Sequence, residues 1–195
     1  MEELKENDMM RSLYEKLGNF IPDNEQEAID LILTRKFLTE GETPFLRTNE
    51  TAHFTASAWI VNPARTKVLM VYHNIYNSWS SVGGHVDGDE NLLAVALKEA
   101  REETGIEHMH PVSEEPFSLE ILTVNGHEKR GEYVSSHLHY NVTYLLEAED
   151  NDELQVKPDE NSAVAWFTFN DALEASTEPW MVERVYRKLM KKLEK

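Results

Sequence analysis

The chain has 195 residues, of which 41% are hydrophobic, so it can bury a sizeable core in one domain but is too short for two full domains. Its formal net charge of −17 disfavours long DNA or RNA as a partner, because nucleic-acid binding depends on basic surfaces. The chain contains no cysteine, which excludes disulfides and thiol nucleophiles and fits a reducing cytoplasm.

The first 48 residues are predicted to be a helical extension. Apolar residues at helical spacing mark a first helix, at Leu13, Leu17 and Phe20, and a second apolar segment covers 28–37. Turn residues at 22–24 and 41–44 divide and end these helices. The N-terminus lacks the basic start and apolar core of a signal peptide, and no run approaches 18 apolar residues, so we expect a soluble cytoplasmic protein.

Residues 49–195 mix strands and helices and are predicted to form the main domain. Alternating and β-branched segments predict strands at 54–61, 67–73, 117–124, 135–146 and 164–169, with a further strand leading into Gly83-Gly84. A polar stretch at 125–132 joins the strands at 117–124 and 135–146. Helices are predicted between the strands and at the C-terminus, so this order predicts an α/β fold arranged as a layered α/β/α sandwich.

Two helices close the chain, one near 171–175 and one from Pro179, which suits a first helical turn, to about Leu193. The last helix has apolar residues at helical spacing, namely Met181, Val182, Val185, Leu189 and Leu193. A role at a membrane surface is one interpretation of this pattern. Docking on the domain is the preferred one, because anionic lipid would repel so acidic a chain.

An acidic helix between two turns is the most informative segment, at residues 84–106. Asp89 is predicted to cap its N-terminus, and Gly105 is placed for a left-handed C-terminal stop. At about 100° per residue, three glutamates share a sector of about a quarter-turn beside the apolar stripe: Glu99, Glu102 and Glu103. Three carboxylates therefore converge at the edge of a buried face.

Carboxylates held this close favour either raised pKa values or a bound cation. Oxygen ligands select hard ions, so the pattern indicates Mg²⁺, or Mn²⁺ as a substitute, with water and substrate phosphate oxygens completing the coordination. The alternative is an acidic surface helix with ordinary solvated ion pairs. The position of the carboxylates beside the apolar stripe, with glycines at Gly84 and Gly105, favours the metal site.

Over these 23 residues the segment resembles the Nudix box, the signature of the Nudix hydrolases. The pattern is Gly, five residues, Glu, seven residues, Arg-Glu, an apolar residue, any residue, Glu-Glu, any residue, Gly, and an apolar residue. One position departs from it, because Lys98 replaces the usual arginine. Lysine keeps the charge but lacks the planar guanidinium that grips two oxygens, which we expect to affect rate and not reaction type.

The resemblance implies a Nudix-type α/β/α sandwich with a mixed sheet, and it implies roles for particular residues. Glu99, Glu102 and Glu103 match the glutamates that bind the divalent metal. Supporting positions are Gly84, Glu90, Lys98 and Gly105. A further ligand or base often precedes the last strand in this family, where Glu160 is the candidate and Asp159 the runner-up, so the expected catalytic residues are Glu102, Glu99 and Glu160.

The implied reaction is attack of water on a phosphorus of a nucleoside diphosphate linked to another group, which splits the pyrophosphate bond. A Nudix-like module that senses a nucleotide without turnover stays open as the alternative. Prenyl diphosphate isomerisation is disfavoured by the missing cysteine, and a decapping role by the missing basic face. The expected partner is a small nucleotide-like diphosphate, with no long nucleic acid or membrane, and homodimers are common among similar proteins.

Four histidines near the predicted site have no assigned role. His137 and His139 share one face of a predicted strand, where they could contact substrate or metal, although a structural or solvent-facing role is preferred. His53 and His85 flank the site in sequence, and for these a packing role is expected.

Overall fold

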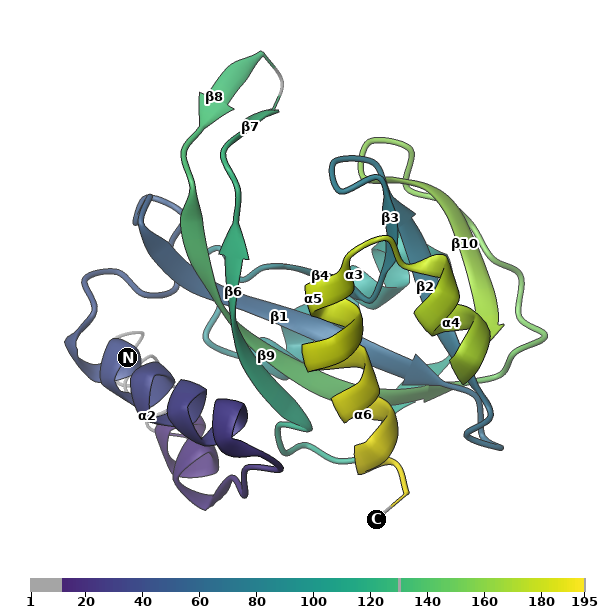
Figure 1. Cartoon of the computed structure of the whole chain (residues 1–195), viewed down its shortest axis with the longest axis horizontal. Helices are drawn as coiled ribbons and strands as arrows, with labels where there is room; N and C mark the ends of the chain where they lie inside the picture. Colours follow the sequence, from purple (N-terminus) through teal and green to yellow (C-terminus); the bar gives the residue numbers. More distant parts are fainter. Residues whose placement is uncertain (1–11, 130, 195) are drawn as a thin grey trace.

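The computed structural model describes residues 12–129 and 131–194. These residues fold around an eight-stranded sheet that carries helices on both faces, as Figure 1 shows. The predicted α/β/α sandwich with a mixed sheet is therefore confirmed. A separate two-stranded hairpin, which the sequence did not predict, projects from the sheet; it begins in the polar stretch at 125–132 and ends just after it (Figure 1).

The main sheet has the order β10-β2-β1-β9-β5, while β3 pairs with β2, β4 with β1, and β6 with β9. Its strands are β1 Ala52–Val61, β2 Lys67–His73, β3 Ser78–Ser80, β4 Val82–His85, β5 Met109–Pro111, β6 Ser118–Val124, β9 His137–Ala148 and β10 Asn161–Thr168; the hairpin comprises β7 His127–Lys129 and β8 Glu132–Val134. The β1–β9 pair is parallel and the other pairs are antiparallel.

Strand alternation divides the core into two layers. Ala56 and Ala58 of β1 face the layer that includes helix α3, Leu92–Thr104. Trp59 and Val61 face the opposite layer, where the C-terminal helices lie. The sequence predicted β1 and β2 closely, because both strands are buried on two faces and read as nearly continuous apolar segments.

Helix α3 carries the acidic segment, and its ends differ from the prediction at one point. Asn91, not Asp89, caps the N-terminus, because its side chain accepts from the Ala94 N–H at 3.1 Å. Asp89 instead accepts from the Asn91 N–H at 2.9 Å, in the turn before the helix. Gly105 ends α3 as predicted, in the left-handed conformation with φ of 75°.

The C-terminal helices cover the face opposite α3 (Figure 1). They are α4 Phe169–Ala175, α5 Pro179–Met181, a π-helical turn Val182–Tyr186 and α6 Arg187–Lys192. Val182, Val185 and Leu189 are buried against the sheet, which confirms the predicted docking. Helix α4 begins at the end of β10, because Thr168 caps it by accepting from the Asp171 N–H.

The N-terminal helices lie beside the β6–β9 part of the sheet (Figure 1). Residues 12–19 are helical, and α2 runs over Glu25–Glu40 with Asn24 as its N-cap. Phe37 of α2 stacks on Tyr140 of β9 with ring centroids 4.1 Å apart. The structure confirms two helices in this segment, while residues 1–11 of the predicted extension lie outside the described residues, and the boundary at residue 48 stays a prediction.

A buried ion group, here called the Glu27 network, joins the extension to the domain. Glu27 of α2 and Glu120 of β6 are fully buried, and Lys188 is 4% exposed. Lys188 Nζ lies 3.3 Å from Glu27 and 2.7 Å from Glu120, while Lys192 Nζ lies 2.7 Å from Glu27. Ser118 donates to Glu27 at 2.8 Å. Each charge in the network has an oppositely charged partner, and this attraction offsets the cost of removing the charges from water.

None of the helices in residues 12–129 and 131–194 combines the length and the apolar character that a membrane span requires.

We expect Glu27→Gln to lower the free energy of unfolding by about 3 kcal/mol or more, because removing one member leaves buried ammonium charge uncompensated. Glu25→Gln, at an exposed position in the same helical turn, is the matched control and should change stability by less than about 0.5 kcal/mol. Urea denaturation of the three proteins measures both values. Equal stability of the two variants would contradict this account of the network.

The same network predicts a pH dependence. Burial disfavours the charged form of Glu27, but Lys188, Lys192 and the Asp23 N–H outweigh burial and lower its pKa below the ordinary 4.5. A carboxyl with a lowered folded pKa stabilises fully above its unfolded pKa, and the contribution is lost as pH falls through the folded value. The stability difference between wild type and Glu27→Gln should therefore shrink below pH 4.5. A stability difference that stays constant down to about pH 3 would contradict the lowered pKa of Glu27.

Candidate active site

Two glutamates of α3 turn toward the sheet at β4. Glu99 is 7% exposed and Glu103 is 2% exposed, and the Gly83 N–H donates to Glu103 at 3.2 Å. A Cβ added to Gly84 would lie 2.7 Å from Glu99 Cδ, which is closer than real side chains approach. Glycine is therefore needed at residue 84 so that the helix carboxylates can lie directly against the strand.

A third carboxylate comes from the chain just before β10. The carboxylate oxygens of Glu99, Glu103 and Glu160 all lie within 4.8 Å of one another, and these three residues are here called the carboxylate cluster. Glu160 remains partly exposed, with 37% of its side chain accessible. The cluster thus has two buried members and one that faces solvent.

The carboxylate cluster concentrates negative charge in a poorly solvated place. Burial, followed by the charges of Glu160 and Glu99, raises the pKa of Glu103 to about 8, although the Gly83 N–H opposes this shift. A bound cation would relieve the repulsion. The donors are all oxygens, and such a set fits a hard divalent ion, Mg²⁺ or Mn²⁺.

Glu102 lies outside the carboxylate cluster, at its rim. Its carboxylate pairs with Lys157 at 2.9 Å and with Lys98 at 3.6 Å. The hydrogen bond from Lys157, supported by Lys98, lowers the pKa of Glu102. Lys98 also reaches Glu99 at 3.2 Å, so the lysine contacts two of the glutamates that the sequence grouped together. The role of Glu102 as a metal ligand stays a prediction.

Lys157 was not predicted from the sequence, yet it links two candidate catalytic groups. Its Nζ lies 3.0 Å from Glu160 as well as 2.9 Å from Glu102. Burial opposes its charge, but these two carboxylates outweigh burial and raise its pKa, so the side chain is cationic. The only local signal was the spacing of three residues between Lys157 and Glu160, which is too common to identify a site.

These residues line a cleft of about 360 Å³, which is large enough for a small ligand. Its wall also includes Thr55, Ser57 and Asn141, whose polar side chains form a hydrogen-bonded group. Both hydroxyls donate to Asn141 Oδ1, at 3.0 Å and 2.8 Å, and Asn141 Nδ2 donates to Glu120 at 3.3 Å. The cleft is therefore continuous, through side-chain contacts, with the Glu27 network.

The remaining predicted residues occupy different places around this cleft. Asp159 lines it next to Glu160, Glu90 is buried just before α3, and Gly105 ends that helix. Asn141 was not predicted from the sequence, although polar residues at alternate positions along β9 indicate a polar strand face.

Comparison of the chain with known proteins identifies its family. The family model described as the NUDIX domain matches residues 51–192. The chain is 33% identical over 98 residues to the mouse bis(5'-nucleosyl)-tetraphosphatase [asymmetrical], a match that covers 49% of this chain and 59% of the mouse protein. The rat protein of the same name is 31% identical over 97 residues, with the same shares. The chain thus spans about three fifths of these relatives.

Solved structures show the same fold at low sequence identity. The Escherichia coli dihydroneopterin triphosphate pyrophosphohydrolase superposes with a TM-score of 0.52 at 16% identity, covering 71% of this chain and 94% of that one. The NUDIX domain of Shewanella oneidensis NrtR, solved with ADP ribose, gives a TM-score of 0.51 at 17% identity, covering 82% and 95%. With the family model matching most of its length, the chain belongs to the NUDIX domain family.

Proposed function

We propose that this protein is a divalent-metal-dependent hydrolase that cleaves the pyrophosphate bond of a nucleoside diphosphate linked to another group. The observation that carries the proposal is the convergence of Glu99, Glu103 and Glu160 in a cleft that also presents Lys98 and Lys157. Membership of the NUDIX domain family supports it.

The carboxylate cluster would hold Mg²⁺, with Mn²⁺ as a substitute. When bound, the ion offsets negative charge on the phosphoryl oxygens and so makes phosphorus easier to attack. The neighbouring ammonium groups of Lys98 and Lys157 orient the same oxygens from the rim of the cleft. Metal and lysines together explain how so acidic a chain accepts an anionic substrate.

Glu102 is the proposed proton acceptor. It is exposed at the cleft rim, where water has access. Water adds its oxygen to phosphorus, its proton passes to the Glu102 carboxylate, and the bridging P–O bond breaks. The bonding electron pair leaves with the departing phosphate, and Glu102 then returns its proton to solvent.

The proposed substrate class follows from the cleft and the relatives. The mouse and rat relatives are named for a bis(5'-nucleosyl) tetraphosphate, and the NrtR domain was solved with ADP ribose, so both involve a nucleoside joined to a phosphate anhydride. Tyr76 lines the same cleft and stacks on His73 with centroids 4.3 Å apart, which offers an aromatic surface for a base. A small nucleotide, and not a long nucleic acid, suits the cleft volume.

We expect Glu102→Gln to lower kcat by about 100-fold or more, because the change removes the proton acceptor at nearly constant volume. Glu107→Gln, at an exposed position beyond the end of α3, is the matched control and should retain the wild-type rate. Steady-state kinetics with Mg²⁺ measure both variants. Wild-type turnover by Glu102→Gln would refute its assigned role.

Enzyme and nucleotide sensor are distinguished by a substrate panel. We expect the wild-type protein with Mg²⁺ to release phosphate products from at least one of four classes: dinucleotide polyphosphates, ADP-ribose, nucleotide sugars and nucleoside triphosphates. Chromatography of the products and calorimetric binding are measured in parallel. Tight binding of a compound without product from any class would favour a sensor and contradict the hydrolase.

Gly84→Ala tests the close approach of strand and helix. The added methyl would displace Glu99, so we expect the Mg²⁺ concentration for half-maximal activity to rise by about tenfold or more. Gly18→Ala is the control, because its added methyl meets nothing closer than 4.0 Å. An unchanged Mg²⁺ requirement in Gly84→Ala, with the fold retained by circular dichroism, would show that Glu99 does not hold the ion.

A further inference from the structure

Four histidines outside the carboxylate cluster converge on one point. His53, His85, His137 and His139 each offer a ring nitrogen, and these four atoms lie within 4.8 Å of one another. We propose that this four-histidine cluster binds a single transition-metal ion, with Zn²⁺ the preferred ion, at a site distinct from that of the carboxylates. Imidazole nitrogen suits Zn²⁺ and its transition-metal neighbours, whereas oxygen donors suit Mg²⁺.

The register of three neighbouring strands brings these histidines together. His53 of β1 pairs directly with His139 of β9, and His137 lies two residues before His139, on the same strand face. His85 of β4 pairs with Thr55, which lies two residues after His53 and therefore also shares that face. All four side chains thus project from one side of the sheet.

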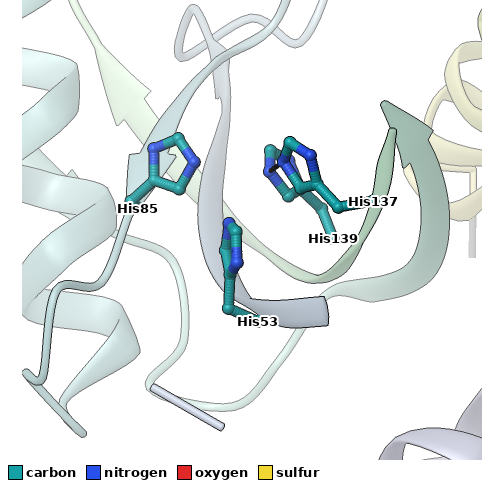
Figure 2. A group of neighbouring side chains, drawn as sticks. All are labelled: His53, His85, His137 and His139. Carbon is teal, nitrogen blue, oxygen red and sulfur yellow. Dashed lines mark hydrogen bonds between the residues drawn. The ribbon is translucent and has the colours of Figure 1, made fainter. Parts of the chain in front are cut away.

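The geometry is close to that of a tetrahedral nitrogen site. Zn–N bonds of about 2.0–2.1 Å place tetrahedral ligand nitrogens roughly 3.3 Å apart. The Nε2 atoms of His137 and His139 are 3.0 Å apart and share a hydrogen bond, whose proton a bound ion would replace. Figure 2 shows His85 on one side of a common space, His137 and His139 together on the other, and His53 between them. The four ring nitrogens lie within 4.8 Å of one another, so the rings would have to move closer together to bind one ion.

Two of the rings are held by the contact that orients metal-binding histidines. His53 Nδ1 lies 3.0 Å from the Asn49 carbonyl and His137 Nδ1 lies 2.8 Å from the Ser135 carbonyl. A carbonyl only accepts, so each Nδ1 carries the proton, and each neutral ring has its lone pair on Nε2. A backbone carbonyl bound to the second ring nitrogen fixes the tautomer in this way at many metal sites.

One nitrogen of the cluster has its hydrogen-bonding capacity unused. His53 is 4% exposed, and its Nε2 is buried without a hydrogen-bond partner among the described residues. A buried acceptor left in this state costs free energy. An ion at the centre of the cluster would satisfy this lone pair of His53.

The charge state of the cluster agrees with metal binding. Burial, followed by the charges of the neighbouring imidazoles, lowers the pKa of His139 to about 2, and burial also lowers the pKa of His53. These rings are therefore neutral at neutral pH, and neutral imidazole is the form that binds a metal.

Cobalt binding tests the proposal, because tetrahedral Co²⁺ with nitrogen ligands absorbs visible light strongly and hexa-aqua Co²⁺ does not. The full chain is stripped with a chelator and saturated with Mg²⁺, and Co²⁺ is then titrated. We expect one equivalent of tetrahedral Co²⁺ in the wild type and a loss of affinity of about tenfold or more in His139→Asn. His108→Asn, an exposed histidine, and Glu103→Gln should both bind Co²⁺ as the wild type does.

The Glu103→Gln protein separates this inference from the proposed hydrolase, since it alters only the carboxylate cluster. X-ray absorption of the zinc-loaded wild type provides a readout that needs no variant, and we expect at least three imidazoles bound at about 2.0–2.1 Å. The proposal is overturned by fewer than three imidazoles, by the absence of tetrahedral Co²⁺ in the wild type, or by equal affinity in folded His139→Asn.

Discussion

The parallel pairing of β1 with β9 is the constraint on which the rest of the structure depends. Ten residue pairs, from Ala52 with Leu138 to Val61 with Glu147, fix which side chains of both strands share a face. A slip of one residue would turn Thr55 and Ser57 into the apolar layer under α3 and expose their neighbours in the cleft. Parallel strands need a long connection, and here residues 62–136 form it. Because this connection contains β4, α3 and β6, the β1–β9 pairing positions elements of both the core and the cleft wall.

The same strand face connects the cleft to the N-terminal helices. From Thr55 and Ser57 the contacts run through Asn141 to Glu120, and from Glu120 through Lys188 to Glu27. The family model begins at residue 51, so Glu27 lies outside the part that defines the family. It nevertheless supplies a carboxylate to the buried Lys188 and the partly buried Lys192 of the C-terminal helix. The extension therefore completes the charge balance of the domain, because a buried ammonium without its partner is costly.

The sequence predicted well what local interactions determine. The stop at Gly105 and the length of α3 follow from helix periodicity and from the freedom of glycine at positive φ. The N-cap was misplaced by two residues because Asp89 and Asn91 are equally good caps, and only the hydrogen bonds separate them. Helix geometry grouped Glu102 with Glu99 and Glu103, but it cannot show which carboxylate faces Glu160, since that depends on how the loop before β10 returns to the helix. The positions of Lys157 and of the four-histidine cluster likewise depend on contacts between residues far apart in the sequence, so the sequence did not predict them.

Strand alternation at two adjacent residues explains how one cleft presents two kinds of donor. Gly84 faces α3, where its missing side chain makes room for Glu99, whereas His85 faces the opposite side of the sheet, toward His53 and His139. The carboxylates thus gather on the helix side of β4 and the imidazoles on the other side. Since Mg²⁺ prefers oxygen and Zn²⁺ binds imidazole well, the proposed ions would each bind on their own side of the strand. Exchange of the two proposed ions would place Mg²⁺ among neutral imidazoles, which offset its charge poorly. The alternation that builds the cleft would therefore also keep the two proposed sites chemically distinct.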